Sequence, residues 1–210
     1  VTLGIFTDKA VCGHRSLPIL SFQERKHIGA NLKGVDKVVE QDEWSYVKNI
    51  LKFKPNFFVH GDDWIESDNK LREEVLIALK SYGGELIETP KSELVLSAKD
   101  RFLRSQQINS VNRLSSLRRL ISCKKIVRLI ETHNPMSALI AEVLKVHNKE
   151  SNEYEFFDGF WSSSLTDSTS MGLPDIVVLD FSRRIQNINS IFDVTTKSLV
   201  YDADTGGISE

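Results

Sequence analysis

The sequence predicts an α/β protein in which two blocks of alternating strands and helices follow one another. Three observations lead to this prediction. Residues 1–89 alternate short apolar runs, typical of buried strands, with amphipathic stretches typical of helices. Residues 124–204 repeat the alternation, and the basic, polar residues 94–122 between the blocks lack it. Strands separated by helices pair in parallel, because the helix returns the chain to the start of the next strand.

The composition is that of an ordinary folded protein. The 210 residues are 40% hydrophobic and 27% charged, with a formal net charge of −2. A charge this small gives no global attraction to nucleic acid or to an anionic membrane. No apolar run reaches the roughly 20 residues of a membrane span, and the apolar start lacks the features of a signal peptide. Cys12 and Cys123 lie far apart without metal-ligand spacing, so we expect free thiols in the cytoplasm.

The first block divides into strands and helices at recognisable signals. Its strands are short runs rich in β-branched and aromatic residues, namely VTLGIF, VDKVVEQ, NFFVHGDDW with its polar end, and ELIETP. Ser21 and Glu24 form a capping box that starts a helix over residues 21–34. An amphipathic helix over residues 44–54 stops at Pro55, and the next helix, over residues 69–84, closes on two glycines.

Residues 100–122 are interpreted as a linker and the helix that leads into the second block. Basic side chains crowd this stretch and its end, namely Arg113, Arg118, Arg119, Lys124 and Lys125. They form either a patch for a phosphate backbone or a solvated helix face. No aromatic residues are interleaved within residues 113–125 to stack on bases, which favours the solvated face and predicts no nucleic-acid partner.

The second block contains three strand-plus-loop units. Its strands are KKIVRLIETH, EFFDGFWSSSLT and KSLVYDAD, and each ends in polar residues. Helices follow the first two, and Asn134 and Pro135 provide the start of NPMSALIAEVLKVHN. In a (β/α)₈ barrel, the rim formed by the strands' carboxyl ends carries the chemistry. A whole barrel needs about 250 residues, so we expect an incomplete one here.

Several residues at these strand ends have the chemistry of a site. Asp202 and Asp204 are two apart on a strand, so both side chains point to one face, and glycines follow them. Carboxylates open to water suit Mg²⁺, and a solvated Asp-Gly turn is the alternative. Asp175 is either a site residue or the cap of the following helix. His133 either joins Asn134 in capping a helix or belongs to the site, and the Ser-rich loop after Trp161 offers amides and hydroxyls to an anion.

Four segments, IETHNPMSALIAE, FDGFWSSSLTDS, GLPD and YDADTGG, occur in this order. Together they resemble phosphoenolpyruvate mutase of the isocitrate lyase-like barrel superfamily, over residues 110–210. The resemblance implies Mg²⁺-dependent interconversion of phosphoenolpyruvate and phosphonopyruvate, the step that forms the C–P bond in phosphonate biosynthesis. A phosphonopyruvate hydrolase or a C–C lyase of the same superfamily is the rival enzyme.

The resemblance also implies roles for individual residues. Asp202 would be the main metal-side carboxylate, Asp204 would reach the ion through water, and Asp175 would lie near the migrating phosphoryl group. The loop that holds the substrate carboxylate and enolate oxygen would comprise Trp161, Ser162, Ser163, Ser164 and Leu165. Because the phosphoryl group and the enolate are both anionic, the reaction needs charge neutralisation and fixed placement.

The first block resembles the small cytidylyltransferases that act on glycerol phosphate, in the version fused ahead of phosphoenolpyruvate mutases. LPILSFQERKHIGANLKGVDKVV and KPNFFVHGDDW carry this likeness, which covers residues 1–99. It implies a Rossmann-like nucleotidyltransferase domain that uses CTP. The implied nucleotide-site residues are His60, Gly61, Asp62, Asp63, Trp64 and Ser97. Arg25 is either a phosphate contact or a helix-surface arginine.

The first block departs from its family in two places. The H-x-G-H signature would precede Val1, and TPKSELVLSAKD has Leu94 where glycine is expected and Ala98 where a hydroxyl is expected. These departures favour a second class of function, a non-catalytic remnant that binds a nucleotide or a partner chain. We expect the chain to be a piece of a longer, homo-oligomeric enzyme, with a barrel part at residues 123–210 that is inactive alone because the later strands would supply further groups.

Overall fold

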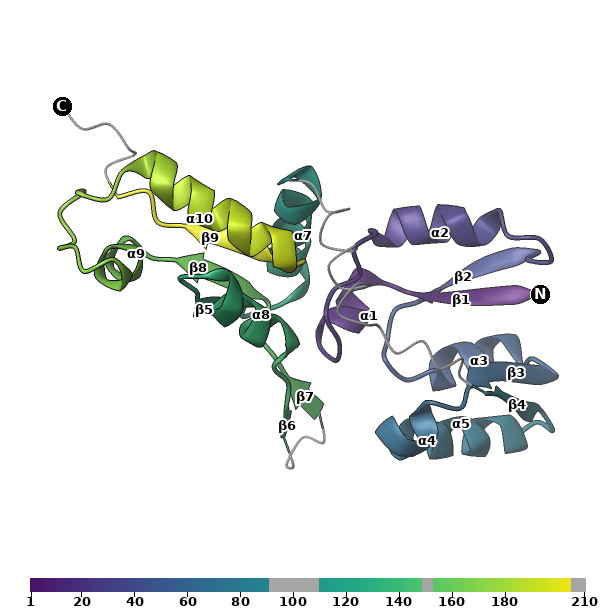
Figure 1. Ribbon diagram of the computed structural model, residues 1–210. Coiled ribbons are helices and arrows are strands. Elements are labelled where there is room, and N and C mark those ends of the chain that lie inside the picture. The colour runs from purple at the N-terminus through teal and green to yellow at the C-terminus, as the bar shows by residue number, and fades with distance from the viewer. Residues whose placement is uncertain (91–109, 149–152, 205–210) are drawn as a thin grey trace. The chain divides into compact units, whose positions relative to one another are not determined.

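A computed structural model describes residues 1–90, 110–148 and 153–204 of the chain (Figure 1). The chain divides into two units, each described separately below. The first comprises Val1–Gly13 and Leu20–Val95, and the second comprises His14–Ile19 and Leu96–Glu210. Within the described ranges, none of the helices combines the length and the hydropathy of a membrane span.

The first unit contains two parallel strand pairs. Strand β1 (Thr2–Phe6) pairs with β2 (Lys37–Gln41), and β3 (Phe57–Gly61) pairs with β4 (Glu85–Thr89). Helices connect the strands, because parallel pairing requires the chain to return before each new strand. These helices are α1 (Asp8–Cys12), α2 (Phe22–Ala30), α3 (Val47–Phe53), α4 (Trp64–Ser67) and α5 (Asn69–Lys80).

Local sequence sets where α2 begins and how closely it packs. The predicted capping box is confirmed, since Ser21 Oγ accepts from the Glu24 amide and the Glu24 carboxylate accepts from the Ser21 amide. Gly29 lets α2 approach β1, because a Cβ there would stand 2.8 Å from Ile5 Cδ1. Side chains of α3, α4 and α5 form the core of the unit, namely Ile50, Trp64, Leu71, Val75, Ala78 and Leu79.

The second unit is built on an open parallel sheet with strand order β5 (Leu129–Glu131), β8 (Gly159–Ser162) and β9 (Ser198–Tyr201). Helices α8 (Pro135–Val143) and α10 (Phe181–Val194) contact each other and share one core with β8 (Figure 1). The remaining elements are α7 (Ser110–Cys123), the antiparallel hairpin strands β6 (Val146–Asn148) and β7 (Glu153–Glu155), and α9 (Ser164–Ser170).

These two architectures confirm the predicted fold class. The first unit is Rossmann-like, with parallel strands joined by helices. The second is part of a (β/α)₈ barrel, and the residues described form no closed barrel. Asn134 caps α8 and Pro135 opens it, as predicted, but the helix ends at Val143. The β6–β7 hairpin then occupies residues for which a longer helix and a continuous strand were predicted.

The start of α10 also differs from the prediction. The helix begins at Phe181, and the side chain of Asp180 accepts a hydrogen bond of 3.1 Å from the Ser182 amide. The interpretation of Asp175 as the cap of this helix is therefore wrong. Val177 has a φ of 62°, in the left-handed region, so a helix begun at Asp175 would be interrupted there.

Arg113 of α7 is buried and bonded to backbone. Its Nη1 donates to the carbonyl oxygen of Lys197 (2.6 Å), and its Nη2 donates to those of Thr195 (2.6 Å) and Phe192 (2.9 Å). Burial lowers the pKa of the Arg113 guanidinium to about 10, so it stays charged at neutral pH. Both sequence interpretations, a phosphate patch and a solvated helix face, are therefore wrong for this residue. It instead attaches α7 to the end of α10 and the approach to β9.

Replacing Arg113 by Met should lower the free energy of unfolding by about 3 kcal/mol, because three carbonyl oxygens lose a charged donor. Urea denaturation of the two proteins measures the difference. Arg118→Met is the matched control, since Arg118 lies exposed on the same helix, and should cost less than about 0.5 kcal/mol. Equal losses in the two variants would contradict the role assigned to Arg113.

Candidate functional site

The carboxyl ends of β8 and β9 bring two predicted site segments together. Parallel pairing sets Ser162 beside Tyr201, so the residues that follow each strand meet at one edge. The Asp202 amide donates to the Ser162 carbonyl oxygen at 3.0 Å. The hydroxyl of Ser164, at the start of α9, donates to Asp202 Oδ2 at 3.2 Å. We call this edge, with Ser162, Ser163, Ser164, Asp202 and Asp204, the rim.

The two aspartates of the rim are held by the backbone turn that joins them. The Asp204 amide donates to Asp202 Oδ1 at 3.1 Å, and Asp204 has a φ of 49°, which tightens the turn. This hydrogen bond, assisted by the amide and hydroxyl of Ser164, lowers the pKa of Asp202. Asp202 is therefore a carboxylate at neutral pH, as a metal ligand must be.

Two residues that the sequence analysis did not single out support the rim, since both bond to rim residues. Arg184 of α10 and Asp167 of α9 are 4% and 3% exposed, and Arg184 Nε donates to Asp167 Oδ2 at 2.9 Å. Ser162 Oγ donates to the same carboxylate oxygen at 3.0 Å. The sequence does contain a signal for Arg184, which shares the buried stripe of its helix with Ile188 and Ile191. A charged residue in such a stripe needs a buried partner.

The other residues predicted for this site are Ser163, Trp161, Leu165 and Asp175. Ser163 precedes α9 as its N-cap residue but makes no side-chain capping bond. Trp161 and Leu165 are 37% and 58% exposed. Asp175 lies in an exposed turn, and within the described ranges no hydrogen bond or ion pair joins it to Asp202 or Asp204. The roles predicted for these residues stay predictions.

The donor set at the rim fits Mg²⁺. Asp202 and Asp204 offer carboxylate oxygens, and Ser164 offers a hydroxyl oxygen. Among the residues described, no group of three or more His, Cys, Asp and Glu side chains is placed to hold a metal. Mg²⁺ does not need one, because it is usually bound through one or two carboxylates together with waters and substrate oxygens.

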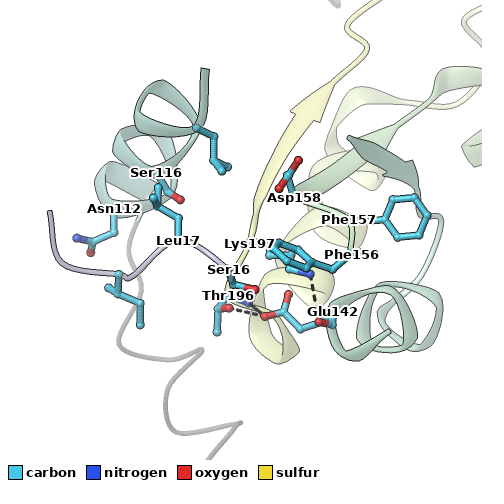
Figure 2. A pocket seen from close by; sticks show the side chains of 12 residues that line it. Ser16, Leu17, Asn112, Ser116, Glu142, Phe156, Phe157, Asp158, Thr196 and Lys197 are labelled. Carbon is cyan, nitrogen blue, oxygen red and sulfur yellow. Dashed lines mark hydrogen bonds between the residues drawn. The ribbon is translucent and has the colours of Figure 1, made fainter. Parts of the chain in front are cut away.

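A cavity of about 100 Å³ lies elsewhere in the second unit (Figure 2). Asp158 and Lys197, which line it, immediately precede β8 and β9, so the cavity is at the amino ends of the strands. Lys197 Nζ donates to the Glu142 carbonyl oxygen at 3.1 Å, and Glu142 Oε1 also accepts from the Thr196 hydroxyl. Burial lowers the pKa of Lys197. The cavity is therefore separate from the rim.

The candidate site of the first unit centres on His60, at the end of β3. Its Nδ1 lies 2.8 Å from the Gly61 carbonyl oxygen, which can only accept, so Nδ1 carries the proton. Tyr46 then donates to His60 Nε2, at 3.0 Å. The imidazole stacks on the Trp64 ring with centroids 3.8 Å apart. These contacts fix the orientation of the ring in one tautomer.

Trp64 is part of the core and not an exposed ligand contact. It is 2% exposed, and its Nε1 donates to Glu88 Oε1 at 2.7 Å. Arg72 donates to both oxygens of the Glu88 carboxylate at 2.8 Å. These bonds, from Arg72 first and Trp64 second, lower the pKa of Glu88 to about 2. Asp62 and Asp63 lie between β3 and α4, and the Asp62 amide donates to the Thr89 carbonyl oxygen at 3.0 Å.

The guanidinium of Arg25 is already engaged within the first unit. Its Nη2 pairs with Asp8 Oδ1 at 2.7 Å, and its Nη1 donates to the Phe6 carbonyl oxygen at 2.7 Å. Its Nε donates to the Leu20 carbonyl oxygen at 3.2 Å. A phosphate would have to share or displace these partners. Ser97, the other predicted phosphate contact, lies outside the described residues.

Each of the two units contains a match to a known protein family. Residues 117–210 match the family model of phosphoenolpyruvate phosphomutase, and residues 2–79 match that of cytidylyltransferase-like proteins. The chain thus contains one segment similar to each of these families. They stand in the predicted order. The phosphomutase match includes the whole rim, and the cytidylyltransferase-like match includes His60 and Trp64 but ends before Glu88. A search of curated proteins found no match.

The Glu88 carboxylate should make the cytidylyltransferase-like unit acid-sensitive. Its pKa in the folded state, about 2, lies below its ordinary value of 4.5. The stability it contributes is therefore complete above about pH 4.5 and is lost as the pH falls toward 2. Urea denaturation at a series of pH values should show a smaller acid-dependent loss for Glu88→Gln than for the unaltered protein. Glu85→Gln, at an exposed position of the same strand, should retain the full loss, and identical profiles for the three proteins would refute the assignment.

Proposed function

We propose that the protein to which this chain belongs interconverts phosphoenolpyruvate and phosphonopyruvate in phosphonate biosynthesis. Two findings support the proposal. Residues 117–210, which lie in the second unit, match the phosphoenolpyruvate phosphomutase family. The hydroxyl-rich loop after β8 contacts Asp202 at the end of β9, so groups for an anionic substrate and groups for a divalent cation share one edge. That contact is the observation that carries the proposal.

The reaction is an isomerisation, so its atoms and charges balance within one molecule. The phosphoryl group leaves the enol oxygen of phosphoenolpyruvate and bonds to carbon 3, which breaks one P–O bond and forms one C–P bond. The fragments in between are a pyruvate enolate, whose carbon 3 donates the electron pair of the new bond, and a metaphosphate-like group, whose phosphorus accepts it, and both carry negative charge. The site must therefore hold two anionic fragments close together and keep water from the phosphoryl group.

The rim residues divide this work. We assign the substrate carboxylate and the enolate oxygen to the backbone amides and hydroxyls of Ser162, Ser163 and Ser164. Asp202 and Asp204 would hold Mg²⁺, which supplies positive charge opposite the enolate and phosphoryl oxygens. Asp175 would lie beside the migrating phosphoryl group. The exposed side chains of Trp161 and Leu165 would close over the substrate and exclude water.

A hydrolase or a C–C lyase of the same superfamily is the rival activity. In a hydrolase, water takes the phosphoryl group and phosphate is released with pyruvate. In a mutase, no phosphate appears and the phosphorus stays bonded to the three-carbon unit. The two outcomes differ in the chemical shift of phosphorus, so one experiment separates them.

The composition of the chain and its charged substrates favour the cytoplasm as the location.

Phosphorus NMR of the protein that contains this chain, with phosphonopyruvate and Mg²⁺, should show a phosphonate resonance replaced by that of phosphoenolpyruvate. Asp202→Ala should reduce the rate by at least about a hundredfold, because the carboxylate that would hold Mg²⁺ beside the substrate is lost. Asp193→Ala, at an exposed position of α10, is the control and should keep the rate. Growth of an inorganic phosphate resonance would instead assign the hydrolase, and an unchanged spectrum would remove both activities.

For the first unit we propose that it binds CTP as a cytidylyltransferase-like module. The family match over residues 2–79 and the ordered imidazole of His60 at a strand end support this. The rival interpretation is a remnant that binds a partner chain, and the engagement of Arg25 by Asp8 favours it.

Titration calorimetry with CTP separates these two interpretations. Binding that His60→Ala weakens about tenfold or more would support the nucleotide site, because the imidazole and its hydrogen bonds are lost. His27→Ala, at an exposed position of α2, is the control and should bind as the unaltered protein does. No heat of binding at millimolar CTP would favour the partner-binding remnant.

A further inference from the structure

We infer that Arg184 is a positioning residue that holds Asp202 and Asp204 in the arrangement needed for a divalent cation. The inference rests on the proposed function and deepens it, since it concerns the same rim. Arg184 belongs to α10, a helix that otherwise contributes apolar residues to the core. It would not touch the substrate, and it would act through the two aspartates.

The guanidinium of Arg184 contacts Asp167 and both aspartates of the rim. Arg184 Nε donates to Asp167 Oδ2 at 2.9 Å, and Nη1 donates to the Asp202 carbonyl oxygen at 2.8 Å. Nη1 also lies 3.3 Å from Asp204 Oδ2, in an ion pair. One side chain thus bonds to the backbone of the first aspartate and to the carboxylate of the second. It therefore adds two contacts to the turn that the Asp204 amide bond already closes.

The surroundings of Arg184 hold the guanidinium in place. The guanidinium carbon lies 4.4 Å from the centroid of the Tyr201 ring, and Phe181 packs edge-on against that ring at 5.9 Å. Asp167 is fixed in turn by the hydroxyl of Ser162. A guanidinium stacked on an aromatic ring and paired at one edge has little freedom to turn.

The pairing of Arg184 with Asp167 is incomplete in an informative way. Arg184 Nη2 and Asp167 Oδ1 are buried and make no hydrogen bond within the described residues. A guanidinium and a carboxylate optimised for each other alone would form a fork of two parallel hydrogen bonds. Here only the Nε bond of such a fork is formed, while Nη1 donates to the Asp202 carbonyl oxygen and to Asp204. The Arg184 side chain is therefore oriented by the turn that joins Asp202 and Asp204 as well as by its buried partner, Asp167.

The charges at the rim support the same role. The carboxylates of Asp167 and Asp204 pair with one guanidinium, and the carboxylate of Asp202 lies in the same turn as Asp204, so negative charges outnumber the positive charge. Without Arg184, the Asp204 carboxylate would lose its ion pair and would be free to turn toward solvent. Arg184 thus holds the Asp204 carboxylate and the backbone of Asp202 in place before the cation binds.

Hydrogen exchange of the Asp204 amide in the metal-free protein tests the inference without any activity. Arg184→Gln should speed this exchange at least about tenfold, because the turn loses a charge-assisted bond. Arg184→Lys keeps the charge and should give an intermediate exchange rate. This variant keeps the test decisive if Arg184→Gln fails to fold. Arg183→Gln, at the exposed neighbouring position, should exchange as the unaltered protein does. Unchanged exchange in both Arg184 variants would overturn the inference.

Binding of Mn²⁺, measured by electron paramagnetic resonance on the same proteins, provides the second readout. Arg184→Gln should weaken Mn²⁺ binding at least about fivefold while Arg183→Gln does not, and Arg184→Lys should recover part of the loss. Thermal unfolding identifies any variant whose fold has been lost. If the unaltered protein binds no Mn²⁺, the proposed metal site fails, yet the exchange rates still decide whether Arg184 holds the turn. Full Mn²⁺ affinity in Arg184→Gln would contradict the positioning role.

Discussion

The parallel pairing of β8 with β9 is the constraint on which the candidate site depends. It places the residues after each strand at one edge, so Ser162 and Asp202 share a backbone hydrogen bond although they are distant in sequence. An antiparallel arrangement would send the hydroxyl loop and the aspartates to opposite ends of the sheet. The rim exists because a helix, α10, returns the chain between the two strands and brings Arg184 with it.

The sequence predicted the parts of the fold that local chemistry determines. The capping residues Ser21 and Asn134 start their helices as expected, because a cap is decided by bonds within one turn. The start of α10 was not predicted correctly, since Asp175 and Asp180 are equally good caps in sequence. Only the left-handed backbone of Val177 excludes the first of them. The β6–β7 hairpin, with its short strands, gives too little periodicity to be recognised.

The candidate site was predicted in outline and missed in its supporting contacts. The two strand-end segments were expected to meet, because strand ends in a parallel sheet share an edge. Arg184 and Asp167 were not, because their pairing depends on how α9 and α10 pack. Arg113 was misassigned for the same reason, since a basic residue on a helix appears solvated until its neighbours are known. Arg113 and Arg184 both donate from a helix to backbone carbonyl oxygens of other segments.

The two units use their predicted site residues in opposite ways. In the first unit, Trp64 and Arg25 are occupied by internal partners, so a ligand would compete with Glu88 or Asp8 for them. At the rim of the second unit, the supporting bonds fall on Arg184 and Asp167, which are buried, while Asp204 remains exposed. A site needs groups that are held in place and still accessible. The rim combines both properties, which is why the phosphoryl chemistry is assigned to the second unit and nucleotide binding alone is proposed for the first.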